Sequence, residues 1–227
     1  MAYNLPGLES DLTLSGETVA GIYLGEITRW NDPRIAAINP DISLPDHPIY
    51  VAHRSDSSGT TYIFTDYLSA ISETRRERAG PAKQLYWPTG DDWAGEGNDG
   101  VAHRILLEPG GIGYLELKYA QNAGLKYARL MNRDGHVVLP TVESVQQAES
   151  NTPATPGTYL KPSIVNAPGE HSYPMAGFTY LLVYGDLSDM DPDWGKARSV
   201  FLWWLVGGGG EVAARLRSTR LPVSVRR

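Results

Sequence analysis

The spacing of apolar residues along the chain predicts short strands that alternate with helices. The apolar run Ile49–Ala52 is uninterrupted, which is typical of a strand buried on both faces of a sheet. The following stretch, residues 58–71, carries Ile63, Phe64, Tyr67, Leu68 and Ile71 at helical spacing. Strand and helix signals in this alternation indicate an α/β fold with a largely parallel sheet.

The same patterns predict the other elements. Ser15 is expected to cap a helix that carries Val19, Ile22 and Tyr23, and Asn98-Asp99-Gly100 to cap a helix that begins at Val101. Residues 1–7 resemble the end of a strand running into a turn, and 150–174 a long loop. Further helices are expected at 33–38, 116–123, 141–149, 192–205 and 211–217, and strands at 112–115, 126–131 and 178–184.

The most informative segment runs from Val51 to Thr61, where a strand is followed by a turn of small residues and a helix start. Ligands of open α/β sheets bind beyond the carboxyl ends of the strands. The first N–H groups of a helix lack internal partners and attract anions. Ser58 and Thr60 add hydroxyl groups, and Gly59 lets a ligand approach the backbone. Arg54 can grip two oxygens of a tetrahedral anion. This turn therefore predicts an oxyanion site.

Asp56 lies in the same turn, where a carboxylate would repel an anion that has no proton to donate. Phosphate carries one or two protons at neutral pH, whereas sulfate carries none. Asp56 is therefore expected to favour phosphate over sulfate.

The turn taken alone also has a simpler interpretation. Ser, Thr and Gly are common at helix starts, and Arg54 with Asp56 could form a surface ion pair. No lysine follows Gly59, so the turn is not a nucleoside-triphosphate loop of the Walker type.

Composition narrows the possible functions. The chain has 227 residues, 41% of them hydrophobic, and a net charge of −6 without any basic cluster, so nucleic acid is not an expected partner. It has no cysteine, and its histidines lack the spacing of metal ligands, so no metal site and no cofactor are expected. The apolar run 200–206 is far too short to span a membrane, and residues 1–7 are not a signal peptide.

Several motifs in order resemble the phosphate-specific solute-binding proteins of ABC transporters. Residues 4–7 resemble the NxPG strand end of that family, residues 22–32 its IYxGxIxxWxD signature, and residues 54–60 its RxDxSGT anion loop. Trp87-Pro88, 97–101 and 109–114 resemble its next blocks, and the order holds over roughly the whole chain.

The resemblance implies a two-lobed type 2 periplasmic-binding-protein fold that closes over phosphate. Residues 1–172 would form the second lobe, which carries the anion loop, and residues 173–227 would return into the first lobe. Arg54, Asp56, Ser58, Gly59 and Thr60 match the phosphate ligands of the family position by position. The implied function is extracytoplasmic or periplasmic phosphate delivery to an ABC permease, by a protein that is not an enzyme and is monomeric when complete.

The chain departs from the family at its start, where family members carry a substantial stretch before Asn4 that builds most of the first lobe. The chain is therefore expected to hold one face of the phosphate site and to bind phosphate weakly by itself. Phe201, Trp203 and Trp204 are expected to form an exposed patch, because the lobe that would cover them is incomplete.

Three alternatives remain at this point. A phosphatase-like enzyme on the same scaffold would need a nucleophile or a metal set, and the sequence offers neither. A phosphate-sensing or interaction protein would dock to a partner rather than carry solute. A fragment without independent function would have an in-frame first lobe encoded upstream.

Overall fold

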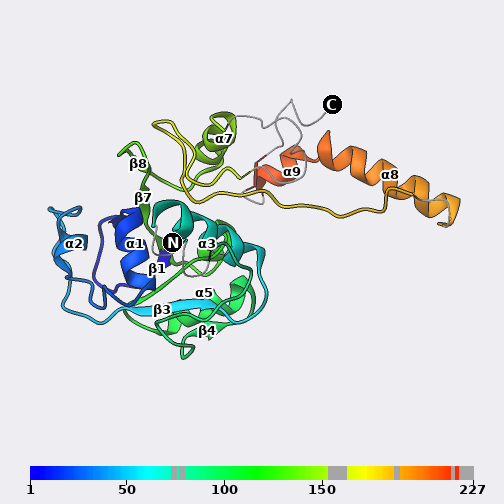
Figure 1. The fold of residues 1–227 in the computed structure, drawn as a ribbon. Helices are drawn as coiled ribbons and strands as arrows, with labels where there is room; N and C mark the ends of the chain where they lie inside the picture. The colour runs from blue at the N-terminus through cyan, green and yellow to red at the C-terminus, as the bar shows by residue number, and fades with distance from the viewer. Residues whose placement is uncertain (73–75, 77–79, 153–162, 187–189, 216–217, 220–227) are drawn as a thin grey trace.

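The computed structural model describes the 227 residues apart from 73–75, 77–79, 153–162, 187–189, 216–217 and 220–227. A globular part contains both sheets and most of the helices, and the chain then leaves it as an extended arm that leads to the last two helices (Figure 1). Within the described ranges, no helix combines the length and apolar character that a membrane crossing requires.

The main sheet has five strands in the order β4-β3-β5-β1-β6. These are β4 (Ala94–Gly95), β3 (Tyr50–Arg54), β5 (Gly111–Gly113), β1 (Ala2–Tyr3) and β6 (Lys126–Tyr127). Strand β3 runs parallel to β4 and β5, as predicted, but β1 is antiparallel to both of its neighbours. The sheet is therefore mixed rather than largely parallel. Strand β1 leads into the other sheet, so no crossover helix fixes its direction within this one.

A second, three-stranded sheet has the order β2-β7-β8. Strand β2 (Thr13–Leu14) pairs in parallel with β7 (Arg129–Met131), which pairs in antiparallel fashion with β8 (Val137–Val138). The strand expected at 126–131 is thus divided between the two sheets, since Lys126 and Tyr127 belong to β6. The backbone N–H of Ala128, between the two strands, donates to the carbonyl of Met1.

The helices mostly begin where the caps predict. Ser15 and Thr18 form a capping box at the start of α1 (Gly16–Tyr23), and Thr141 and Ser144 form another at the start of α7 (Val142–Ser150). The predicted cap at Asn98 is wrong, because α5 (Gly97–Leu107) already begins at Gly97 and Glu96 is its N-cap residue. The other helices are α2 (Pro33–Ala36), α3 (Gly59–Ile71), α6 (Leu117–Asn122), α8 (Pro192–Val206) and α9 (Gly210–Arg215).

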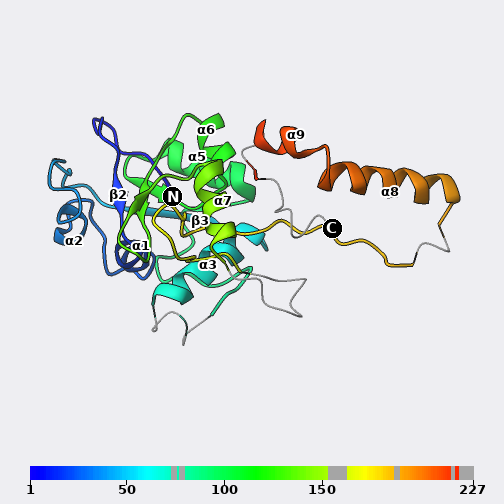
Figure 2. The ribbon, with the colours of Figure 1, turned by 90° about the horizontal axis from the view of Figure 1, so that it is seen from above.

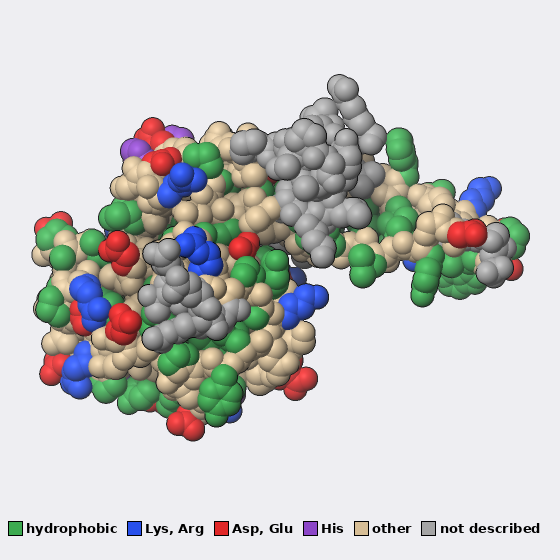
Figure 3. All heavy atoms as spheres, viewed as in Figure 1, with side chains coloured by type: hydrophobic (Ala, Val, Ile, Leu, Met, Phe, Trp, Pro, Cys, Tyr) green, Lys and Arg blue, Asp and Glu red, His purple; other side chains and the backbone are tan. Residues whose placement is uncertain are grey.

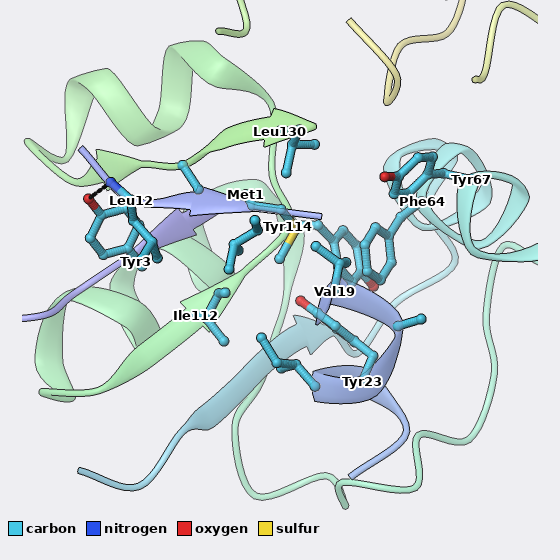
Figure 4. Close-up of a cluster of buried hydrophobic side chains, with 14 of the residues drawn as sticks. Met1, Tyr3, Leu12, Val19, Tyr23, Phe64, Tyr67, Ile112, Tyr114 and Leu130 are labelled. Atoms are coloured by element: carbon cyan, nitrogen blue, oxygen red, sulfur yellow. Dashed lines mark hydrogen bonds between the residues drawn. The ribbon is translucent and has the colours of Figure 1, made fainter. Parts of the chain in front are cut away.

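Helices cover both faces of the main sheet. Successive strand residues point to opposite faces, so Val51 joins the larger apolar cluster with α1 and α3, whereas Ala52 packs against α5 on the other face. In the larger cluster, Tyr23, Phe64, Trp87 and Tyr114 lie ring against ring, with centroids 4.4–6.0 Å apart. Figure 4 shows Tyr23, Phe64 and Tyr114 of this group. This layering fixes the strand that carries Arg54 against the helix that follows it.

The globular part and the arm differ in burial. Tyr173 and Ala176 still pack in the larger cluster, but residues 180–184 and much of α8 are exposed. The expected exposed patch is confirmed, since Phe201, Trp203 and Trp204 are all exposed and Trp203 is 76% accessible. The strand predicted at 178–184 is wrong, because these residues form no strand and have no neighbouring strand in the described chain to pair with. The division between lobes at residue 172 stays a prediction.

Candidate functional site

The candidate site lies at the carboxyl end of β3, where Arg54 is the last strand residue and α3 starts at Gly59. The turn between them is fixed by its backbone. The N–H of Ser55 donates to the carbonyl of Gly95 over 3.0 Å, and the N–H of Ser58 donates to the carbonyl of Lys83 over 2.9 Å. All five predicted site residues are therefore held together on one strand–turn–helix unit.

Arg54 and Asp56 form a two-pronged ion pair inside this turn. The Nε of Arg54 donates to Oδ1 of Asp56 over 2.7 Å, and Nη2 donates to Oδ2 over 2.6 Å. The guanidinium hydrogen bonds are the main reason why the pKa of Asp56 lies well below its usual range, with the N–H of Gly97 adding a further bond over 3.1 Å. The same pairing raises the pKa of Arg54. Both groups therefore stay charged.

The ion pair leaves part of the guanidinium available. It engages Nε and Nη2, whereas the N–H groups of Nη1 donate to no acceptor in the described part of the chain. The Arg54 side chain is 11% accessible, so it lies largely below the surface with its direction fixed by Asp56. A guanidinium held in this way loses little side-chain entropy when it binds an oxyanion.

The first turn of α3 supplies further donors. The Oγ of Ser58 accepts a hydrogen bond from the N–H of Thr61 over 3.2 Å, which caps the helix and leaves the hydroxyl hydrogen able to donate. The N–H groups of Gly59 and Thr60 donate to no acceptor within the described ranges. A Cβ built on Gly59 would meet nothing within 4 Å, so the space beside this backbone is open. An anion can therefore approach these amides closely.

Tyr114 is a site residue to which the sequence analysis assigned no individual role. Its hydroxyl accepts from the backbone N–H of Arg54 over 3.2 Å and shares a hydrogen bond of 2.9 Å with Oγ1 of Thr61. Burial raises the pKa of this hydroxyl, so it remains protonated. Tyr114 thus joins the end of β3 to the first turn of α3. The sequence signals were its place in the block 109–114 that resembles the family and its position just after β5, the strand that pairs with β3.

The start of α5 completes the surroundings of Asp56. Gly95 lies so close to this helix that a Cβ on it would stand 2.5 Å from the carbonyl carbon of Gly100. This approach brings the N–H of Gly97 to Asp56 and the positive end of the helix dipole to its carboxylate. The side-chain amide of Asn98, in the first turn of α5, donates to Oε1 of Glu116 over 3.2 Å.

His53 precedes Arg54 and has a packing role. Its ring is buried, lies 5.8 Å from the ring of Trp87 and has Nε2 2.9 Å from the carbonyl oxygen of Gly90. No group of three or more His, Cys, Asp or Glu side chains arranged for a metal occurs among the described residues.

Residues 1–206 match the PBP superfamily domain. The chain belongs to the PBP superfamily. Among curated members, it is 38% identical over 223 residues to the phosphate-binding protein PstS of Pasteurella multocida, covering 98% of this chain and 64% of that protein. It is 40% identical to PstS of Methanocaldococcus jannaschii, covering 92% of this chain and 57% of that protein.

Solved structures of this superfamily share the fold. The chain superposes on a DING protein with a TM-score of 0.68, at 20% identity, covering 99% of this chain and 67% of that one. It also superposes on PfluDING, a high-affinity periplasmic phosphate-binding protein solved with phosphate, with a TM-score of 0.64 at 20% identity. This match covers 99% of this chain and 66% of PfluDING. The expected type 2 periplasmic-binding-protein fold is confirmed. The chain spans about three fifths of the length of the PstS relatives.

Proposed function

We propose that this PBP superfamily chain binds inorganic phosphate through Arg54, Asp56, Ser58, Gly59 and Thr60. The observation that carries the proposal is the guanidinium of Arg54, which Asp56 orients through Nε and Nη2 while Nη1 remains available, at the end of the strand that leads into the open first turn of α3. Backbone amides, a hydroxyl and a fixed guanidinium together form the donor set that a tetrahedral oxyanion needs.

Asp56 has two roles in this proposal. It fixes the direction of Arg54, and it retains acceptor capacity on Oδ2, which takes one hydrogen bond among the described residues. A protonated oxygen of phosphate could donate to Oδ2, whereas sulfate has no proton to offer and would face an ionised carboxylate. Phosphate is therefore the preferred anion.

The names of similar proteins support a proposal for the biological role. PstS of P. multocida is named as a phosphate-binding protein. A structure of similar fold from Clostridium perfringens is named as a putative phosphate ABC transporter substrate-binding protein. We propose that this chain is part of an extracytoplasmic protein of the same kind, which delivers phosphate to an ABC permease without catalysing a reaction. A monomeric state of the complete protein and the lack of a nucleic-acid partner remain predictions.

The test compares Arg54→Ala with Arg34→Ala. Arg34 makes a matching two-pronged pair with Asp32, also two residues away, but its side chain is 50% accessible and lies outside the anion turn. Charge-assisted hydrogen bonds contribute about 1.5–3 kcal/mol each, so Arg54→Ala should lower phosphate affinity by more than about tenfold.

Phosphate binding is measured by equilibrium dialysis with labelled phosphate or by ³¹P NMR line broadening. The Arg34→Ala control should bind as the parent chain does. Phosphate binding that survives Arg54→Ala unchanged would place the anion elsewhere on the molecule.

A further inference from the structure

The side chain of His53 is the buried polar group next to the anion turn. Strand β3 runs between α3 and α5 (Figure 2), and alternation along the strand places His53 on the same face as Val51, which packs with α1 and α3. His53 is 2% accessible, so the hydrogen-bond partners of its two ring nitrogens have to come from the protein.

Both ring nitrogens of His53 face oxygen atoms that can only accept hydrogen bonds. Nδ1 lies 3.2 Å from the carbonyl oxygen of Arg54, and Nε2 lies 2.9 Å from the carbonyl oxygen of Gly90. A neutral imidazole carries one N–H, so it can donate to one of these carbonyls and turns a lone pair toward the other. An imidazolium donates to both. The arrangement therefore fits the doubly protonated form of the ring.

The groups around the ring are compatible with a charge on it. Oδ1 of Asp91 lies 3.6 Å from Nε2, and its carboxylate is still 56% accessible to water. The guanidinium of Arg54 points to the other face of β3, where a carboxylate already pairs with it. The hydroxyls of Tyr23 and Tyr114 stay protonated because burial raises their pKa, and α3 contributes the apolar Phe64. A proton on the ring thus meets one carboxylate and two carbonyl dipoles, which offset the cost of burying a charge.

The loop 83–95 connects the ring to the anion turn. Near its start, the carbonyl of Lys83 accepts from the N–H of Ser58 over 2.9 Å. At its end, the carbonyl of Gly95 accepts from the N–H of Ser55 over 3.0 Å. The carbonyl that faces Nε2 belongs to the middle of the same loop. The ring therefore holds the loop that fixes the backbone of the turn.

The peptide unit between Arg54 and Ser55 is held from two sides. Its carbonyl oxygen faces Nδ1 of His53, and its N–H donates to the carbonyl of Gly95. This peptide unit leads directly from β3 into the turn. Its direction therefore influences where the guanidinium stands relative to the first amides of α3.

We propose that His53 is a positioning residue for the anion turn, and that it holds the turn fully only while both ring nitrogens carry protons. When the ring loses one proton, one of its two carbonyl contacts is lost, and the loop 83–95 or the peptide unit after Arg54 is released. The inference rests on the proposed phosphate site. Histidine is the side chain whose charge ordinarily changes between about pH 5 and 8, where Asp56 stays ionised.

The first measurement follows the ring in the 227-residue chain, labelled with ¹⁵N, in phosphate-free buffer between about pH 5 and about pH 9. The ¹⁵N resonances of the His53 ring report which nitrogens carry a proton. Both should be protonated at the acid end, and one should lose its proton as the pH rises. Protection factors of the Ser55 and Ser58 amides, corrected for the intrinsic effect of pH on exchange, should fall by about two- to tenfold over the same interval.

The second measurement compares phosphate binding in His53→Gln and His136→Gln. Gln keeps one amide donor and does not titrate. His136 is an exposed histidine just before β8, the strand near which histidine side chains are visible in Figure 3. Dividing the affinity of the parent chain by that of a variant cancels the protons of the ligand. The ratio for His53→Gln should be about two to ten at the acid end and approach one at the alkaline end, whereas that for His136→Gln should stay near one.

Three results would overturn the proposal. The first is a ring whose protonation does not change between about pH 5 and about pH 9. The second is a set of protection factors that does not follow the titration of the ring. These two need no variant, so they decide the matter even if His53→Gln does not fold. The third is an affinity ratio for His53→Gln that is the same at both ends of the pH range.

Failure of the phosphate site itself gives a different result. Phosphate binding that survives Arg54→Ala, together with protection factors that follow the ring, would refute the site. It would uphold the link between His53 and the turn.

Discussion

The carboxylate of Asp56 stays ionised because the guanidinium of Arg54 and the N–H of Gly97 donate hydrogen bonds to it, which lowers its pKa. Its pKa is lower in the folded chain than in the unfolded chain. The pair therefore stabilises the fold above the usual carboxyl pKa, and this contribution is lost as the pH falls through the lowered value. The charge of Asp56 is constant over the neutral range, so a change in phosphate binding with pH in that range is not expected to come from Asp56.

Replacing Asp56 by Asn tests its proposed part in selectivity. Asn keeps the shape but removes the charge that repels an unprotonated anion, so the ratio of phosphate to sulfate affinity should fall by about tenfold or more, with some phosphate affinity retained. Competition dialysis with labelled phosphate and unlabelled sulfate measures the ratio. An unchanged ratio would mean that Asp56 orients Arg54 but plays no part in the selectivity for phosphate over sulfate.

Replacing Tyr114 by Phe removes the hydroxyl that joins Arg54 to Thr61 and keeps the ring that stacks on Phe64 at 4.4 Å. The loss of these hydrogen bonds should weaken phosphate binding by several-fold, because the first turn of α3 is no longer fixed against β3. Tyr67→Phe is the control, since that buried hydroxyl makes no hydrogen bond in the described part of the chain. A similar loss of affinity in both variants would indicate that Tyr114 supports the core rather than the site.

The elements that sequence patterns predict well are those whose periodicity or cap chemistry is local. The apolar run at Ile49–Ala52 and the helical spacing after Ser58 place β3 and α3 correctly, and with them the strand–turn–helix unit of the site. The caps at Ser15 and Thr141 are confirmed for the same reason, because each involves a residue only three positions away.

Features that depend on distant contacts were not predictable in this way. Helix α5 begins before Asn98 because Gly95 allows the first turn of the helix to approach β4 closely. No residue pattern within 98–101 indicates that contact. The direction of β1 depends on strands more than a hundred residues away. Tyr114 enters the site through the pairing of β5 with β3, which its own surroundings in the sequence do not reveal.

Gly95→Ala probes the contact between β4 and α5. The new Cβ would lie 2.5 Å from the backbone of Gly100, where no flexible side chain can yield, so the free energy of unfolding should fall by about 1–3 kcal/mol. Gly185→Ala is the matched control, since a Cβ there meets nothing within 4 Å and the effect should stay within about 0.5 kcal/mol. Urea unfolding measures both, and equal stabilities would show that α5 can shift without cost.

The extent of the chain has a consequence for affinity. All five proposed ligands lie on one strand–turn–helix unit, and the chain spans 64% of the P. multocida relative. An anion held from one side keeps part of its surface in water, which weakens each hydrogen bond to it. The chain is therefore expected to bind phosphate at least about a hundredfold more weakly than the complete relative, a deficit of about 3 kcal/mol.

Isothermal titration calorimetry of the 227-residue chain and of the P. multocida protein, in one buffer at one temperature, gives the comparison directly. Equal affinities would mean that the described face is sufficient for tight binding. Such a result would contradict the expected need for a second face and would leave the assignment of Arg54 and its neighbours intact.

The distribution of tryptophans gives the molecule a built-in optical reporter. Trp30 and Trp87 are fully buried in the globular part, whereas Trp194 and Trp203 on α8 stand in water. The first pair should emit at short wavelengths and resist acrylamide, and the second pair should emit at longer wavelengths and be quenched readily. Any event that covers α8 will therefore shift the emission to the blue, while unfolding of the globular part will shift it to the red.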